Sequence, residues 1–122
     1  MNIVLWILQI LLAFLFFVHG LAMLRTTDTP PQPTMTYILA IPIPLRRFIG
    51  AAEILASIGL VLPALTGIVP WLTPLAALGL VILMIGAVVF HFLRKDYPSI
   101  VVNLVLLVMA AFVAYGRFTG IS

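Results

Sequence analysis

Four long apolar stretches, separated by polar or proline-rich segments, alternate along the chain. They cover about residues 2–24, 47–65, 71–93 and 98–117. A helix needs about 20 apolar residues to cross the hydrocarbon core of a bilayer, and the stretches lack the period-two alternation of a barrel strand. The pattern predicts an all-α membrane protein, with residues 1–122 forming one domain, a bundle of four transmembrane helices.

The segments between these stretches differ in character. Residues 25–46 form the longest, and their prolines predict a long Pro-rich loop between the first two helices. Within it, Tyr37–Ile41 is apolar but too short to span, so we expect it to lie in the interface or to fold back over the bundle as a lid. Residues 63–70 carry no charge, whereas Arg94–Asp96 form a tight polar turn.

Composition narrows the class of protein. The chain is 65% hydrophobic and only 7% charged, which excludes an ordinary soluble domain. It contains no cysteine, so disulfides, thiol redox chemistry and cysteine-ligated metals are excluded as intrinsic activities. The net charge of +3 could suggest nucleic acid in a soluble protein, but the basic residues lie in or beside predicted loops. We therefore expect a lipid bilayer, and no nucleic acid, as partner.

The basic residues predict an orientation instead. Five of the six flank the first and third connections, and only Arg117 lies at the other end of the helices. The positive-inside rule then places these two connections in the cytoplasm. Both termini would lie on the non-cytoplasmic side of a bacterial inner (cell) membrane.

Glu53 is the acid that lies within a predicted span. An ionisable side chain in this position costs about 2.5–3.5 kcal/mol on insertion scales and by default faces other helices. If the segment is helical, one face carries Arg46, Gly50, Glu53, Ser57 and Leu60. Because small residues let helices approach closely in lipid, this face should lie at the centre of the bundle.

The other three helices each carry a polar residue at a similar depth. Counting 1.5 Å per residue from the cytoplasmic helix ends puts His19, His91 and Asn103 within about 10 Å of that surface, as it does Glu53. We expect these four side chains to converge in one polar pocket beneath the Pro-rich loop. With Arg47, at the start of the second helix, they are the candidate residues for ligand binding or proton exchange.

Glycine spacing adds a packing prediction. Gly79 and Gly86 lie seven residues apart in the third helix and predict a close-packing face there. Ala110 and Ala114 form a similar small-residue pair in the fourth helix.

A carboxylate and a histidine beside an apolar slot can exchange a proton near neutral pH. They would suit a quinone head group, whose carbonyl oxygens need hydrogen-bond donors and whose reduction takes up protons.

Several alternatives stay open. The polar groups could have only a structural role, holding the helices together by hydrogen bonds. Alternatively, the two histidines could ligate haem. A two-histidine, one-carboxylate metal site has the right ligand count, but no i, i+4 ligand pair fixes its geometry, so we expect no metal.

Residues Arg47 to His91, with Asn103 after them, resemble the DoxX-like family of small four-helix membrane proteins. The order of Arg47, Gly50 and Glu53 and the late His91 carry the resemblance, together with the prolines that punctuate the middle hairpin, Pro63, Pro70 and Pro74. The resemblance implies a four-helix bundle. Through the family's namesake it also implies a link to a thiosulfate:quinone oxidoreductase subunit. Relatives in the wider group are implicated in oxidative-stress complexes and in chaperoning membrane receptors.

Taken together, these observations favour a quinone- or lipid-binding membrane subunit of a redox complex. Its partners would be a quinone or lipid ligand and either a redox-complex protein or a second copy of the chain. One alternative is a non-enzymatic scaffold or assembly protein of chaperone-like kind. Another is a small proton-coupled transporter, since a single intramembrane acid in a chain of this size is also typical of those. The sequence leaves open whether the protein is an enzyme.

Overall fold

The computed structural model describes residues 2–26, 29–30 and 33–120. Over these residues the chain forms four α-helices, each long and apolar enough to cross a membrane, and no strand. The elements are α1 (Asn2–Arg25), the 3₁₀ helix η1 (Pro33–Ala40), α2 (Ile43–Thr66), α3 (Leu72–Leu93) and α4 (Tyr97–Phe118). The prediction of an all-helical protein with four membrane-spanning segments is confirmed.

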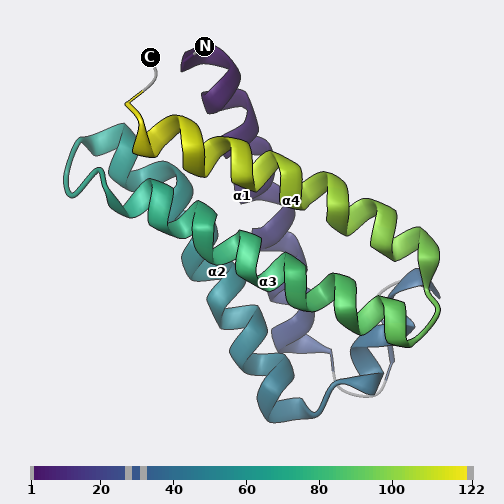
Figure 1. Ribbon diagram of the computed structural model, residues 1–122. Helices are drawn as coiled ribbons and strands as arrows, with labels where there is room; N and C mark the ends of the chain where they lie inside the picture. The colour runs from purple at the N-terminus through teal and green to yellow at the C-terminus, as the bar shows by residue number, and fades with distance from the viewer. Residues whose placement is uncertain (1, 27–28, 31–32, 121–122) are drawn as a thin grey trace.

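The helices form two closely packed pairs, α1 with α2 and α3 with α4. Figure 1 shows both termini at one end of the molecule, with the α1–α2 connection and the α3–α4 turn toward the other. The two pairs diverge toward that second end, and η1 lies between them (Figure 1). This arrangement brings η1 against helices of both pairs.

A continuous apolar core joins the four helices toward the termini. Its fully buried members include Leu5, Leu12, Leu60, Ala77, Leu80, Ala110 and Val113. The outside of every helix is also apolar: Ile3, Leu55, Ile82 and Val108 are all more than 60% exposed. A surface of this kind is stable against lipid tails rather than water.

The connection between α1 and α2 differs from the predicted long loop. η1 occupies residues 33–40, and α2 begins at Ile43 rather than near residue 47, with Pro42 at its N-cap and Pro44 in its first turn. Proline is well tolerated there because the first turn's N–H groups have no helical partner. Pro31 lies outside the described residues. The expected loop of residues 25–46 is therefore replaced, over much of its length, by helical structure.

Pro63, one of the prolines assigned to the middle hairpin, does not end the second helix. It lies inside α2, which continues to Thr66. The helix ends at Gly67, whose positive φ of 73° is the left-handed conformation that glycine adopts without strain, and whose N–H donates to the Pro63 carbonyl.

α1 and α2 approach each other closely at Gly20 and Gly50. A Cβ atom added to Gly50 would lie 2.7 Å from the Gly20 carbonyl oxygen and 3.0 Å from Met23 Cβ. An added Cβ at Gly79 or Gly86 would meet nothing within 4 Å. The prediction of a glycine-mediated packing face on α3 is wrong, and the face that needs glycine lies on the helix that carries Glu53.

We expect Gly50→Ala to destabilise the protein, because the added methyl group must push α1 and α2 apart. Overpacking of this kind typically costs about 1–3 kcal/mol. Thermal unfolding in detergent micelles measures the loss. Gly79→Ala is the matched control: its methyl group enters open space, and alanine favours helix over glycine. Equal losses of stability in the two variants would contradict the close approach at Gly50.

Polar contacts also tie the helices together near the termini. The buried Gln9 donates from Nε2 to the Leu60 carbonyl of α2 at 2.6 Å. Its Oε1 accepts from Nε of Arg117 on α4 at 2.7 Å, and Arg117 also donates to Asn2. Gln9 thus links three helices at the end opposite to the predicted polar pocket.

Candidate functional site

The site begins with the buried face of α2. Its buried residues are Arg46, Gly50, Glu53, Ser57, Leu60 and Pro63. The first five are the stripe expected from helical periodicity, so its inward orientation is confirmed. Glu53 is only 2% exposed. Such an acid needs a charged or hydrogen-bonding partner.

That partner is His19 on α1. Its Nδ1 lies 2.6 Å from Glu53 Oε1 and 3.2 Å from Oε2. The pair is possible because of the glycine crossing one residue away: a Cβ on Gly20 would already lie 3.3 Å from Glu53 Cβ. A larger residue at Gly20 would therefore separate the two helices and lengthen the contact.

Tyr37 of η1 completes a three-residue chain. Its hydroxyl lies 2.6 Å from Nε2 of His19. Burial, together with the nearby charges of Glu53 and Asp96, raises the pKa of Tyr37 to about 12. The hydroxyl therefore keeps its proton at neutral pH. When it donates that proton to Nε2, Nδ1 is the protonated nitrogen and donates to Glu53.

Tyr37 was not among the predicted site residues. The apolar run Tyr37–Ile41 indicated only that this segment folds over the bundle, and Ile38 is indeed fully buried. The available signal was a tyrosine at the start of an apolar run in a connection, because such a residue can bury its ring while its hydroxyl finds a polar partner. Which partner it meets depends on the packing of both helix pairs.

His91 of α3 lies on the far side of Tyr37. The two rings meet edge to face with centroids 4.8 Å apart, while the Tyr37 and His19 rings are stacked at 6.1 Å. His91 is 5% exposed, and its Nδ1 lies 3.4 Å from Asp96 Oδ2, too far for a strong hydrogen bond. Tyr37 therefore separates two histidines that come from different helix pairs.

Asp96 connects this cluster to the end of the bundle. It is the N-cap of α4, and Oδ2 accepts a 2.7 Å hydrogen bond from the Ser99 hydroxyl. The hydrogen bonds from Ser99 lower the pKa of Asp96 below its ordinary value. The carboxylate is therefore ionised at neutral pH, with 31% of the side chain exposed.

Asn103 of α4 contributes an unpaired donor. Its Nδ2 is buried and makes no hydrogen bond within the described structure. A buried amide without a partner is unfavourable by about 1–3 kcal/mol, so such a group is often a ligand or water site.

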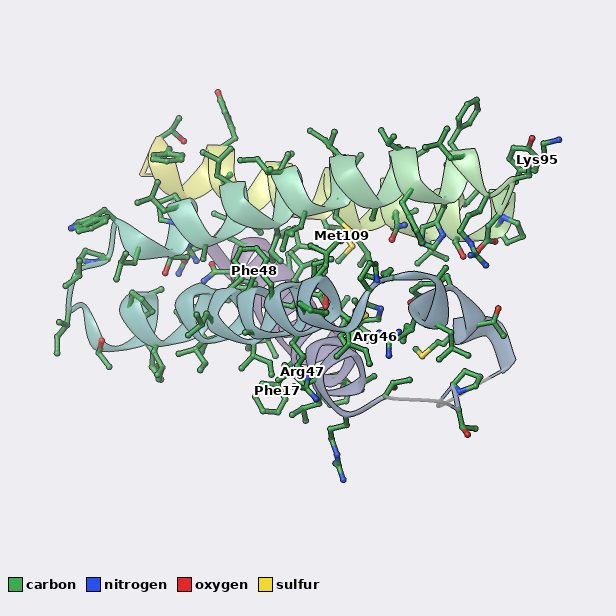
Figure 2. The ribbon with its side chains drawn as sticks, turned by 90° about the horizontal axis from the view of Figure 1, so that it is seen from below. Phe17, Arg46, Arg47, Phe48, Lys95 and Met109 are labelled. Atoms are coloured by element: carbon green, nitrogen blue, oxygen red, sulfur yellow. The ribbon has the colours of Figure 1, made fainter. Side chains whose placement is uncertain are left out.

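The two neighbouring arginines at the start of α2 differ in their burial. Arg47 is exposed and lines neither cavity described below. Arg46 is 3% exposed, and its guanidinium donates to the carbonyls of Thr26 at 2.9 Å and Ile41 at 2.8 Å. Figure 2 labels the two side chains. The buried arginine thus fastens the α1–α2 connection, and Arg47 has no contact with the polar cluster that would support its predicted role.

Two cavities flank the polar cluster. The α2–α3 cavity, about 440 Å³, is lined by all four predicted polar residues, His19, Glu53, His91 and Asn103. The α1–α4 cavity, about 530 Å³, lies on the other side and shares His19, His91 and Asn103 but not Glu53. Tyr37 lines both. The four residues expected to converge thus come together around the tyrosine.

The remaining walls of both cavities are apolar except at Ser99 in the α1–α4 cavity, and both cavities include exposed apolar side chains. Phe48 and Ile82 line the α2–α3 cavity and are 68% and 63% exposed; Phe14 and Val102 line the α1–α4 cavity and are 65% and 57% exposed. In a membrane these side chains contact lipid. Each cavity therefore opens sideways, into the bilayer.

Among the described residues, no three histidine, aspartate or glutamate side chains lie close enough together to hold a metal ion. What the cluster offers is one buried acid, two imidazoles, a phenol and a free amide. Groups of these kinds can form hydrogen bonds with a polar ligand, and carboxyl, imidazole and phenol groups can also exchange protons.

Comparison with known proteins gives the family. The sequence model of the DoxX-like family matches residues 7–113, which include all four helix cores and each polar residue of the cluster. No curated protein and no solved structure matches the chain. Since the match covers most of the sequence, and since four helices can span a bilayer, the chain is an integral membrane protein that belongs to the DoxX-like family.

Proposed function

We propose that the protein binds a lipid-soluble carbonyl compound, best matched by a quinone, in the α2–α3 cavity. The observation that carries this proposal is the unpaired Nδ2 of Asn103 in the wall of an otherwise apolar cavity beside the Glu53–His19 pair. An amide N–H without a partner can donate to a carbonyl oxygen. The surrounding apolar walls suit an isoprenoid or aromatic ring.

The size and opening of the cavity support the same class of ligand. A volume of about 440 Å³ lies within the range of small-molecule sites. The exposed Phe48 and Ile82 at its rim let a hydrophobic tail remain in the bilayer while the polar head reaches the cluster. A water-soluble ligand would have no comparable path from the membrane.

The chemistry fits a compound that gains and loses protons. A bound quinone accepts electrons, and its two oxygens take up protons when it is reduced. Of the chain's own residues, Asn103 would orient one oxygen, and the Glu53–His19 pair would hold a proton close to the cavity. We assign electron exchange to a partner protein and regard this chain as the membrane subunit of a redox complex.

The orientation of the protein is part of this proposal. The connection and turn that carry most of the basic residues lie toward one end and the termini lie at the other (Figure 1). We infer that the basic end, where Lys95 points outward (Figure 2), faces the cytoplasm. The polar cluster would then take up protons from the cytoplasmic side.

Blocking the cavity tests the proposal. Gly86 lines the α2–α3 cavity, and a Cβ atom there meets nothing within 4 Å. We expect Gly86→Leu to fold normally but to weaken binding of a short-chain benzoquinone by at least about tenfold, which corresponds to about 1.4 kcal/mol. Equilibrium titration of the detergent-solubilised protein measures the dissociation constant.

Gly79→Leu is the control. Gly79 lies two turns earlier on the same face of α3, has equal space for a side chain, and lines neither cavity. It should bind the benzoquinone as the unmodified protein does. Absence of saturable binding, or equal weakening by both substitutions, would refute the quinone assignment and favour a scaffold or assembly role without a small ligand.

A further inference from the structure

The Glu53–His19–Tyr37 chain is a continuous hydrogen-bonded path for a proton. Both of its links are 2.6 Å long. Every member can accept and release a proton: the carboxylate oxygen, the two ring nitrogens and the hydroxyl. Among the hydrogen bonds of the described residues, those of His19 link the deeply buried acid to η1.

The path has a continuation on the other side of Tyr37. His91 meets the Tyr37 ring edge to face at 4.8 Å, and its Nδ1 lies 3.4 Å from Asp96 Oδ2. Asp96 lies in the turn between α3 and α4 and is 31% exposed, so it reaches the aqueous boundary. The described residues thus connect a 2% exposed acid to an acid at the surface.

Two steps in this series lack a direct hydrogen bond: the 3.4 Å step from His91 Nδ1 to Asp96 Oδ2, and the step between Tyr37 and His91. Both residues line the two cavities, which are large enough for water. A water in a protein needs two to four polar partners. Tyr37, His91 and Asn103 provide them, and the free Nδ2 of Asn103 provides a donor.

We propose that Tyr37 and His91 form a proton route between the buried Glu53–His19 pair and the aqueous boundary at Asp96. For each proton that moves inward, Nδ1 of His19 gives its proton to Glu53 while Nε2 takes the hydroxyl proton of Tyr37. The Tyr37 oxygen is reprotonated through His91, directly or through one water, and His91 is reprotonated from the boundary. His19 keeps one proton throughout but carries it on Nε2 after the step, so the N–H has to return to Nδ1 before the next proton can move inward.

The purpose of the route rests on the proposed function, since a quinone bound in the α2–α3 cavity would take up these protons. Its existence does not. The route can be tested in protein without quinone, so its failure is separate from failure of benzoquinone binding.

The test measures how fast the imidazole N–H of His19 exchanges with water. The chain has two histidines, so isotope labelling of histidine gives one signal set for His19 and one for His91 in a nuclear magnetic resonance spectrum. We expect Tyr37→Phe, which removes the hydroxyl but keeps the ring, to slow exchange at His19 by about tenfold, the factor for one lost hydrogen bond. Tyr115→Phe is the control, because Tyr115 is 65% exposed near the other end of α4.

A second variant distinguishes a proton route through Tyr37 from a hydrogen bond by which Tyr37 only holds the His19 ring in place. His91→Phe leaves both hydrogen bonds of His19 in place, yet the route requires it to slow exchange at His19 as well. Unchanged or faster exchange at His19 in Tyr37→Phe would overturn the proposal. The proposal would also be overturned if exchange at His19 slowed in Tyr37→Phe but not in His91→Phe, because Tyr37 would then only hold His19 in place.

Discussion

Arg46→Met should release the α1–α2 connection and lower the stability of that region by about 3 kcal/mol, since each hydrogen bond from a charged donor contributes about 1.5–3 kcal/mol. The two carbonyls that Arg46 reaches, those of Thr26 and Ile41, stand at the two ends of the connection. Methionine has a similar length and fills the space but cannot donate. We therefore expect η1 and the first turn of α2 to open about a hundredfold more often.

Hydrogen–deuterium exchange read by mass spectrometry measures this opening peptide by peptide. The amides of η1 and of the first turn of α2 should exchange faster, while the core of α3 and α4 should be unchanged. Arg47→Met is the matched control: the residue is adjacent but exposed. Equal acceleration in both variants would show that Arg46 does not hold the connection in place.

The arginine pair shows what the sequence could and could not reveal about the site. Helical periodicity correctly placed Arg46 on the same face as Glu53. Arg47, the predicted start of the second helix, was nevertheless the arginine included among the candidate site residues. α2 begins four residues earlier, at Ile43, with two prolines at its start. A proline marks a helix end or a helix beginning, and the sequence pattern alone does not distinguish the two.

The convergence of His19, Glu53, His91 and Asn103 was predictable, because depth in a membrane is set by residue count and helix rise. The same count says nothing about rotation or helix contacts. It could not show that Glu53 contacts His19 rather than His91, or that a tyrosine stands between the two histidines. These contacts depend on where α1 and α2 cross, at Gly20 and Gly50, and on the position of η1 between the two helix pairs.

The glycines show the same limit. Spacing alone made Gly79 and Gly86 look like a packing motif, although both face open space. A small residue permits close approach but does not cause it, so the partner surface decides. At Gly86 that open space belongs to the α2–α3 cavity, which is why the residue serves as the test of ligand binding.

The contact between Glu53 and His19 should show strong coupling in a double-mutant cycle. His19→Phe leaves a 2% exposed carboxylate without its donor, and a buried charged group that loses its hydrogen bond costs about 3 kcal/mol or more. Glu53→Gln should cost only about 1 kcal/mol, because the amide oxygen still accepts from Nδ1. In the double variant no carboxylate is buried, so the total loss should fall below the sum.

Unfolding free energies of the four proteins in detergent give the coupling, which we expect at about 2 kcal/mol, above the average of about 0.6 kcal/mol for hydrogen bonds between membrane helices. Ser57→Ala supplies the control cycle with His19→Phe. Ser57 lies one turn from Glu53 on the same buried face, but its hydroxyl donates to carbonyls of α2 itself, those of Glu53 and Ile54. Its loss should add to that of His19→Phe without coupling. Additivity in both cycles would mean that the acid and the imidazole are neighbours without a stabilising interaction, and it would remove the basis for a shared proton at the cavity wall.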